Sequence, residues 1–532
     1  MRTFVFDETA LELSDNPETD LKLATRTVRS FAARIGASVL LLSVLVPAQA
    51  QETRSGIEEI VVTAQKREES INEVGMSIQA ATGDKLIEMG VNDTFDLYKV
   101  VTGFNSNVTY YGTAIYTIRG VGFQDTALAS GPTVSVYLDE VPVPFSAMTP
   151  GLTLDLQRVE ALKGPQGTLF GQNATGGAVN YIANKPTDEL EGGIDVSYGR
   201  FNTVDIQGFL SGPLSDTLSY RVAGRSIGSD GWQKTYTPDS SLQPDPYWTA
   251  YDPDGNYSRD SEAGEQDFLS WRAALLWEPT DQFSALLTGS GFQDDGESQR
   301  PQLYGRAPLN PVNGLNELIE DYPFSPRNNR SADWGPCVNT SGGVPANVIG
   351  TGDGSGGVIG VTDPDGNGAN LSNRLYNNCE DAEKNNNQWA VSLRMDYDLN
   401  DDMTVTSLTS YSKFERDQRL ESDGTYYQDY ESYQDGELKS FFQELRLSGS
   451  VAGSGSWVVG ANYEETKTWD SFIQTYGIST AVPTQVITRI PLGPTNPNNK
   501  QDTETYAAFA NIEYPVLDNV MLQAGVRYTD QK

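Results

Sequence analysis

Apolar and polar side chains alternate along most of the chain beyond about residue 190, in segments of about ten residues. Two of these segments have the apolar positions Val391, Leu393, Met395 and Tyr397, and Val520, Leu522, Ala524, Val526 and Tyr528. Because neighbouring side chains of a strand point to opposite faces, each segment predicts a β-strand with one apolar and one polar face. About eleven such strands are predicted up to residue 532. The pattern fits a sheet between lipid and water, although a soluble β-sandwich would also show it.

The connections between the predicted strands are alternately short and long. Short turns include residues 278–282, 400–402 and 515–519, and long connections include residues 229–267, 294–388, 415–438 and 470–502. Outer-membrane β-barrels have this arrangement, with short periplasmic turns and long extracellular loops. A bacterial single-chain barrel has an even number of strands, whereas about eleven are predicted here, so we expect the C-terminal half of a barrel to be missing.

An export signal is predicted at the N-terminus. Residues 35–46 form an apolar run, and Ala48, Gln49 and Ala50 offer the small residues that a signal peptidase reads. We therefore assign residues 1–50 to a signal peptide. The segment before the apolar run is long and acidic, which leaves the true start codon open. Beyond residue 50 no run of 18 apolar residues occurs, so no transmembrane helix is predicted in the mature chain.

A short apolar segment follows the signal peptide. It consists of Glu58, Glu59, Ile60, Val61, Val62, Thr63 and Ala64. Its β-branched residues favour an extended conformation, but a segment of this length cannot bury itself. It is suited to adding as a strand to the sheet edge of another protein. The alternative is an ordinary first strand of the domain that follows.

A glycine-rich segment between residues 154 and 186 separates two apolar stretches. Its glycines are Gly164, Gly167, Gly171, Gly176 and Gly177. Glycine permits positive φ and close backbone approach, so the pattern predicts a strand or short helix, a tight loop and then a strand. The segment has no nucleophile beside a base, and it suits a small, tightly folded body better than a catalytic site.

The same segment carries a resemblance to a known family. The run RVEALKGPQGTLFGQNATGGAVN at residues 158–180 resembles the plug domain of TonB-dependent outer-membrane receptors. The resemblance implies a transmembrane antiparallel β-barrel of the 22-stranded type, about eleven strands of which are present, with an N-terminal α+β plug domain. Residues 137–142 resemble the YxDGVP hairpin of the family, with Glu140 where glycine is usual, which leaves the turn type open.

The resemblance also implies a division of the chain and a partner. We expect a signal peptide at residues 1–50, a periplasmic tail at 51–69, a plug at 70–187 and a partial barrel at 188–532. Residues 58–64 then correspond to the TonB box, which pairs with TonB, the inner-membrane-anchored partner. Four charged residues of the plug are expected to form salt bridges to the barrel wall or to act as a latch that loosens under pulling: Arg119, Arg158, Glu160 and Lys163.

Composition excludes several function classes. The chain has 72 acidic and 37 basic residues, and a net charge of −35 argues against nucleic-acid binding. It has no histidine, which removes the commonest general base and metal ligand. We therefore predict no enzymatic activity, no catalytic residues, no cofactor and no metal site, and an outer-membrane hydrolase is disfavoured. A signalling receptor is also disfavoured, because residues 51–59 leave no room for the extra domain that such receptors carry.

Three features of the long connections are candidate binding or stabilising elements. Cys337 and Cys379 form one possible disulfide, which would contribute ~4 kcal/mol by chain entropy, or remain two free thiols. Residues 363–368 resemble half of a calcium loop, but a glycine-rich turn is the better interpretation. Aromatic residues of these connections are candidate ligand contacts or pack on one another: Tyr426, Tyr427, Tyr430 and Trp469.

These observations together predict an active importer of the cell outer membrane. By resemblance its ligand is a ferric siderophore, taken up with energy supplied through TonB, and its other partner is outer-membrane lipid. Oligosaccharides, cobalamin and aromatic compounds are alternative cargoes for the same scaffold.

Overall fold

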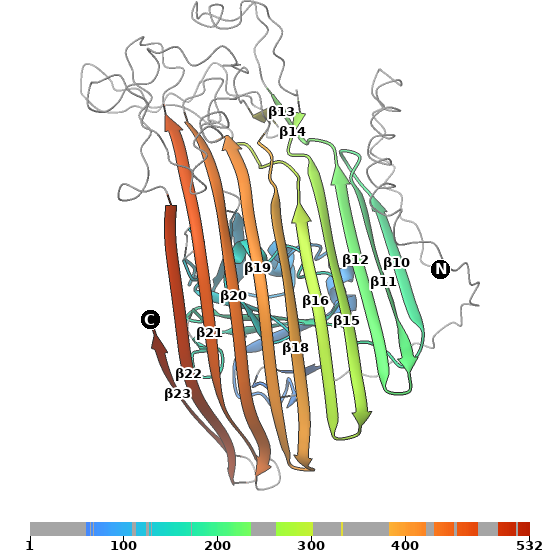
Figure 1. Ribbon diagram of the computed structural model, residues 1–532, viewed down its shortest axis with the longest axis vertical. Coiled ribbons are helices and arrows are strands. Elements are labelled where there is room, and N and C mark those ends of the chain that lie inside the picture. Colours follow the sequence, from blue (N-terminus) through green and yellow to red (C-terminus); the bar gives the residue numbers. More distant parts are fainter. Residues whose placement is uncertain are drawn as a thin grey trace, which may run out of the picture.

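The computed structural model describes most of the chain beyond the predicted signal. It covers residues 60–63, 65–67, 69–108, 113–123, 127–128, 130–171, 173–235, 262–301, 331–332, 382–421, 430–451, 455–476, 498–517 and 520–532. Within these residues the chain forms a large curved sheet and a smaller N-terminal body (Figure 1). No helix among them is long and apolar enough to cross a membrane.

The large sheet has eleven strands, as the alternation predicts. Each strand pairs antiparallel with the next strand of this sheet along the chain, so the sheet is an up-and-down meander. The strands are β10 (Glu191–Tyr198), β11 (Val204–Ser215), β12 (Leu218–Ser229), β15 (Gln266–Thr280), β16 (Phe283–Asp294), β18 (Asn386–Asn400), β19 (Met403–Glu421), β20 (Tyr430–Val451), β21 (Gly455–Tyr476), β22 (Asn498–Leu517) and β23 (Val520–Gln531). Three short strands form a separate sheet: β13 (Gln233–Thr235), β14 (Glu262–Ala263) and β17 (Ser331–Ala332).

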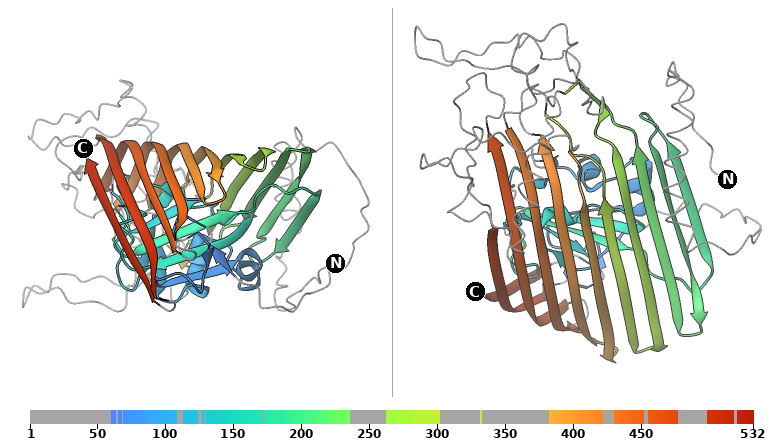
Figure 2. Two further views of the ribbon diagram at one scale, coloured as in Figure 1. Left: turned by 90° about the horizontal axis from the view of Figure 1, so that it is seen from below. Right: turned by 45° about the horizontal axis from the view of Figure 1, so that its top comes forward.

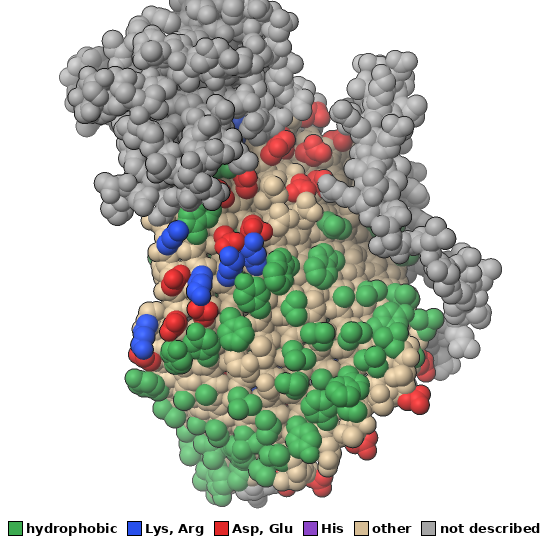
Figure 3. Space-filling view, in the orientation of Figure 1, with side chains coloured by type: hydrophobic (Ala, Val, Ile, Leu, Met, Phe, Trp, Pro, Cys, Tyr) green, Lys and Arg blue, Asp and Glu red, His purple; other side chains and the backbone are tan. Residues whose placement is uncertain are grey.

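The two faces of the large sheet differ as the alternation requires. On β20 the side chain of Leu445 is 56% exposed, whereas its neighbours Glu444 and Arg446 are buried. The outer face carries a broad band of apolar side chains (Figure 3). The inner face carries charged and small polar side chains, and it is covered by the N-terminal body. An apolar face toward lipid and a polar face toward the interior are the arrangement of a transmembrane β-barrel wall.

The N-terminal body is a five-stranded sheet with short helices. The strand order is β3 (Ile78–Thr82), β8 (Leu156–Lys163), β9 (Gly177–Ala183), β6 (Val134–Leu138) and β7 (Val141–Val143). The other elements are β1 (Val61–Val62), β2 (Glu69–Ser70), α2 (Gly83–Glu88), η1 (Thr94–Lys99), β4 (Phe104–Val108), β5 (Ala114–Ile118) and η2 (Ser146–Met148). Of its helices, α2 is an α-helix, and η1 and η2 are 3₁₀ helices. The core of the N-terminal body includes Val159, Val179 and Tyr181, all almost fully buried.

The glycine-rich segment connects β8 and β9 within this body. Gly164, Gly171 and Gly177 have positive φ, whereas Gly167 and Gly176 do not. At Gly177 a Cβ atom would lie 2.3 Å from the carbonyl oxygen of Leu162, so only glycine lets the two strands approach this closely.

The body lies on the concave side of the large sheet (Figure 2). Tyr137 and Phe170 of the body form one apolar cluster with Val458 and Phe509 of the wall. The ring centroids of Tyr137 and Phe170 are 5.1 Å apart in an edge-to-face arrangement. The body therefore packs against the wall as well as facing it.

Candidate functional site

The segment predicted to pair with another protein is folded back on its own chain. Val61 and Val62 of β1 pair antiparallel with Ser70 and Glu69 of β2. The carbonyl oxygen of Ile60 accepts a hydrogen bond from the N–H of Ile71 at 3.0 Å. We call β1, β2 and the described residues 65–67 between them the N-terminal hairpin. Glu58, Glu59 and Ala64 lie outside the described residues.

The N-terminal hairpin is buried against the small body. Val62 is fully buried in the apolar cluster that also holds Phe170. The N–H of Thr63 donates to Oε1 of Glu160 at 2.8 Å, and its hydroxyl lies 3.2 Å from both carboxylate oxygens. Burial raises the pKa of Glu160, while Arg158, 2.7 Å away, and the donors of Thr63 oppose that rise. Glu160 thus holds the end of β1 in place.

The four predicted plug charges contact the small body and not the wall. Arg158 pairs with Glu160, Arg119 donates to the hydroxyl of Ser77 at 2.7 Å, and Lys163 donates to Gln79 and Thr102 at 2.7 Å each. The predicted salt bridges to the wall are therefore not formed by these residues within the described part of the chain. Arg158, Glu160 and Lys163 lie on β8, whose neighbours on both sides are strands of the same small sheet.

The turn of the N-terminal hairpin reaches the wall instead. The ammonium of Lys66 lies 2.6 and 2.8 Å from the two carboxylate oxygens of Glu444 on β20. Gln65 donates to Glu513 of β22 at 2.7 Å, and Arg67 pairs with the same carboxylate. Burial lowers the pKa of Lys66, and Glu444 opposes this shift. A buried amine without that carboxylate would be strongly disfavoured.

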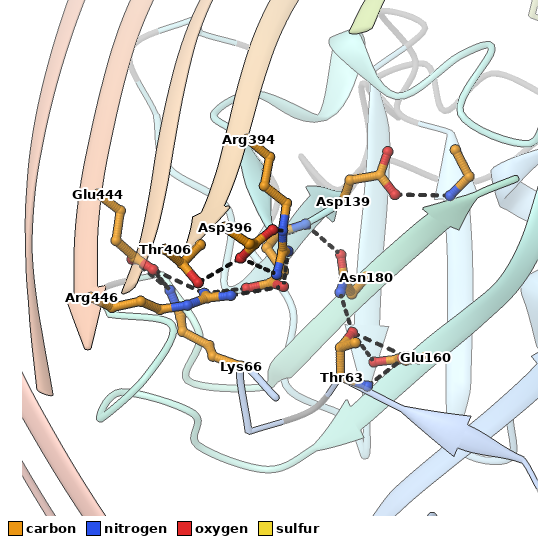
Figure 4. Close-up of polar contacts among 12 residues, drawn as sticks. Thr63, Lys66, Asp139, Glu160, Asn180, Arg394, Asp396, Thr406, Glu444 and Arg446 are labelled. Carbon is orange, nitrogen blue, oxygen red and sulfur yellow. Dashed lines mark hydrogen bonds and ion pairs between the residues drawn. The ribbon is translucent and has the colours of Figure 1, made fainter. Parts of the chain in front are cut away.

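A second contact to the wall comes from Glu140, in the turn between β6 and β7. Its carboxylate pairs with Arg446 of β20 and, at 2.7 Å, with Arg394 of β18, and its N–H donates to Asn180 at 3.2 Å. Burial by itself would raise the pKa of Glu140, but Arg446, Arg394 and Lys66 together hold it well below its ordinary value. Lys66, Glu444, Arg446, Glu140 and Arg394 therefore form one continuous network of ion pairs. Figure 4 shows its members Lys66, Glu444, Arg446 and Arg394 converging between the plug and the wall.

The backbone conformation of Glu140 shows which turn is formed where the family usually has glycine. Its φ is +70°, and that of Asp139 is +50°, both in the left-handed region that favours glycine. For a residue with a Cβ this conformation costs roughly 1–2 kcal/mol. The two guanidinium groups compensate, so the departure from the usual glycine creates a contact to the wall.

Further contacts between body and wall were not apparent from the sequence. Arg221 forms a bidentate pair with Asp155, in which both N–H···O distances are 2.6 Å. Arg225 donates to the carbonyl of Asn92 at 2.6 Å. Arg272 donates to the carbonyl of Leu154 at 2.6 Å. The one available signal was an arginine at a polar position of an otherwise alternating strand.

The predicted disulfide and most of the predicted ligand contacts lie outside the described residues. Cys337, Cys379, Tyr426, Tyr427 and residues 363–368 lie outside the described residues, as does the side chain of Tyr430 at the start of β20. Trp469 is described, and it lies on the opposite face of β21 from Asp470, which bonds to the N–H of Leu128 in the small body. Trp469 is thus on the outer face of the wall.

Comparison with known proteins identifies both parts of the fold. The TonB-dependent Receptor Plug Domain family matches residues 70–178, and the family described as TonB dependent receptor-like, beta-barrel matches residues 321–532. Together these matches cover more than half of the chain. The chain belongs to the TonB-dependent receptor family. TonB-dependent receptors are transport receptors of the outer membrane, and that is the location of this protein. The small body is the plug, and the large sheet is part of the barrel wall.

Curated TonB-dependent receptors share sequence with only part of the chain. The pesticin receptor of Yersinia pestis is 34% identical over 184 residues, which are 32% of this chain and 26% of the relative. The ferric enterobactin receptor PirA of Pseudomonas aeruginosa is 37% identical over 82 residues, 14% of this chain and 11% of the relative. The matched region therefore spans about a quarter or less of the length of these two relatives.

Solved TonB-dependent receptors share the fold over most of the chain. The ferric yersiniabactin uptake receptor of Yersinia pestis superposes with a TM-score of 0.58 at 18% identity, covering 86% of this chain and 56% of that one. The ferripyoverdine receptor of Pseudomonas aeruginosa, bound to ferripyoverdine, gives a TM-score of 0.59 at 14% identity, covering 88% and 54%. The fold described above is thus that of a plug inside about half of a receptor barrel.

Proposed function

We propose that this chain is part of an outer-membrane receptor that imports a ferric siderophore with energy supplied through TonB. The observation that carries the proposal is the N-terminal hairpin. A segment with the composition of a pairing strand is held between the plug and the wall by Glu160 and Glu444. It is positioned to transmit a pull to the contacts that keep the plug in the barrel. Residues 51–69, 70–187 and 188–532 then act as coupling tail, plug and wall.

The charge network connects the pulled segment to the β6–β7 turn of the plug. Residues 58–64 are the proposed TonB box, and Lys66 lies two residues after its end. When TonB draws the box toward the periplasm, Lys66 leaves Glu444, the carboxylate that also pairs with Arg446, and Glu140 loses a nearby cation of the same network. Removing one member of a buried ionic cluster weakens the rest, since each remaining charge is less well compensated. The β6–β7 turn is then free to move away from the wall.

The proposed class of cargo is inferred from the names of the relatives. The names of several of them refer to ferric siderophores, including ferric enterobactin and ferripyoverdine. We propose the same class of cargo for this chain and assign it no catalytic role. Oligosaccharides, cobalamin and aromatic compounds are the alternatives. The Cys337–Cys379 disulfide and the tyrosines at 426, 427 and 430 remain predictions.

Uptake of a labelled ferric siderophore by cells tests the coupling role. Replacing Ile60 with proline removes the N–H that a paired partner strand would need. It leaves the carbonyl of Ile60 available to Ile71. We expect Ile60→Pro to lower uptake at least tenfold while binding of the siderophore to the cell surface is retained, and Ile60→Val to behave as wild type. Full uptake by Ile60→Pro would refute the coupling role. Uptake of labelled oligosaccharide or cobalamin in place of the siderophore would refute the cargo alone.

A further inference from the structure

Three lysines form a row across the outer face of the wall. Lys413 of β19 is directly opposite Lys439 of β20, which is directly opposite Lys467 of β21. Side chains at such positions are about 4.5–5.5 Å apart at Cβ, and like charges there destabilise a sheet. The row points outward, since the adjacent residues Phe414 and Leu438 are buried against the plug. Figure 3 shows charged side chains gathered above the apolar band on this face.

Strand length places the row at the edge of the bilayer. Lys413 lies ten residues from Met403, where β19 begins, and Lys439 and Lys467 each lie twelve residues from the same edge of the sheet. A transmembrane strand crosses the hydrocarbon core in about 9–11 residues. The connections at that near edge are short, residues 401–402 and 452–454, and those at the far edge are longer, residues 422–429 and 477–497. By the barrel rule the far edge is extracellular, so the row faces the outer leaflet.

Aromatic side chains lie beside and just below the row on the same face, with Trp389 directly opposite Lys413. The ring centroids of Trp389 and Tyr411 are 5.6 Å apart, those of Phe441 and Tyr463 are 6.1 Å apart, and those of Tyr463 and Tyr506 are 4.9 Å apart. Such a band marks the interface between hydrocarbon and headgroups. The lysines are therefore at headgroup level, where lipid phosphates are found.

Neighbouring carboxylates offset the repulsion within the row without using all its donors. Lys413 contacts Glu415 at 2.7 Å and Glu437 at 3.0 Å, Glu437 also pairs with Lys439, and Lys467 contacts Glu465 at 2.8 Å. Other outward charges nearby are Lys500, Asp502 and Glu504 on β22. An ammonium group has three donors. The side chains of Lys439 and Lys467 are 40% and 54% exposed, so donors remain for an external anion.

We propose that this lysine row binds the phosphate of a phosphorylated glycolipid of the outer leaflet. The phosphate would lie across Lys413, Lys439 and Lys467, and the acyl chains would lie on the aromatic and aliphatic surface below. Trp469 lies on the same face, opposite Glu437 and Lys500, which places an aromatic side chain beside the row. A sugar ring packs on such a surface better than a simple phosphodiester headgroup does. The proposal concerns the outer face and is independent of the cargo.

Lipid binding by the delipidated full-length receptor in detergent tests the proposal. The probes are bisphosphorylated lipid A, the same lipid without phosphates, and inorganic phosphate, with complexes counted by native mass spectrometry. We expect the triple variant Lys413→Gln, Lys439→Gln, Lys467→Gln to bind phosphorylated lipid A at least tenfold more weakly. The corresponding triple arginine variant should retain binding. A control variant, Lys85→Gln on the plug, should bind as wild type, because Lys85 is a plug lysine that pairs with Glu88.

A second variant keeps the test valid if the triple variant folds poorly. Glu437→Gln removes the carboxylate shared by Lys413 and Lys439, so it should strengthen binding of phosphorylated lipid A several-fold. Unchanged binding in the triple glutamine variant, or weaker binding in Glu437→Gln, would overturn the proposal. Equal binding of lipid A with and without phosphates would also overturn it. So would displacement of the lipid by millimolar inorganic phosphate, which would indicate a simple anion site.

Discussion

At the scale of single residues, Glu140 links the plug to two strands of the wall. It is a buried carboxylate with positive φ, and it is compensated by two arginines from different wall strands. Its pKa in the folded protein is below the ordinary carboxyl value, so it stabilises the folded state at pH values above that ordinary value, about 4.3. This stabilisation is lost as the pH falls further toward the lowered pKa.

Glu140→Gln should weaken attachment of the plug. The variant leaves Arg446 and Arg394 without their shared carboxylate, and breaking such a buried pair typically costs about 3–5 kcal/mol. Urea-induced exposure of the plug to protease, measured on the receptor in detergent, should shift to lower urea. The control Glu88→Gln removes an exposed helix pair and should change stability by less than about 0.5 kcal/mol. Equal shifts for both variants would contradict this assignment.

The same assay followed against pH gives an independent check on Glu140. The contribution of Glu140 to plug attachment should be constant between about pH 7 and 5 and should weaken as the pH falls below about 4.3. Glu140→Gln should lack this part of the acid dependence, because glutamine does not titrate. An identical acid profile in the two proteins would show that other carboxylates dominate.

At the scale of elements, the β8–β9 connection shows why glycine position matters more than glycine content. Gly177 sits where a Cβ would lie 2.3 Å from a backbone oxygen and 2.9 Å from Ile118, whereas the nearest atom to a Cβ on Gly167 is 3.8 Å away. Both glycines belong to the same glycine-rich segment of the sequence, and Gly177 is the first residue of β9. Only the first is required by close approach of two strands.

Gly177→Ala should therefore destabilise the plug, and Gly167→Ala should not. Overpacking and positive φ together predict a loss of about 1–3 kcal/mol or more for Gly177→Ala. Gly167→Ala should lie within about 0.5 kcal/mol of wild type. Protease sensitivity of the receptor measures plug unfolding and distinguishes the two variants. A tolerant Gly177 would mean that β8 and β9 separate easily.

At the scale of the whole molecule, the sheet separates lipid on its outer face from the plug on its inner face. Leu445 is outward and lies six residues from Val451 at the near edge of β20, close to the middle of a transmembrane span. Leu445→Arg should cost about 2–4 kcal/mol in lipid vesicles, measured by urea unfolding. Glu415→Arg, twelve residues from Met403 and at headgroup level, should cost about 0–1 kcal/mol. Equal costs would place the bilayer elsewhere on the wall.

The sequence predicted local structure well where the cause was local. Alternation reflects the geometry of a strand, so the strand count in the wall was correct. The glycine-rich loop and the strand at Val61 and Val62 were predicted for similar reasons. The sequence did not predict the interaction partners of the charged residues. Arg158 and Glu160 were expected to form salt bridges to the wall or to act as a latch. They pair with each other, and Glu160 also accepts from Thr63, while Lys66 and Glu140 make the wall contacts.

By itself, the sequence determined the elements, their lipid-facing and interior faces, and the likeness to a plug, because each depends on residues close together in the chain. Only the tertiary structure decided which charges meet. Lys66 and Glu444 are 378 positions apart, and Glu140 and Arg446 are 306 apart. Pairing over such separations depends on the register of several strands and on how the plug is rotated within the wall. No local pattern of side chains encodes either quantity.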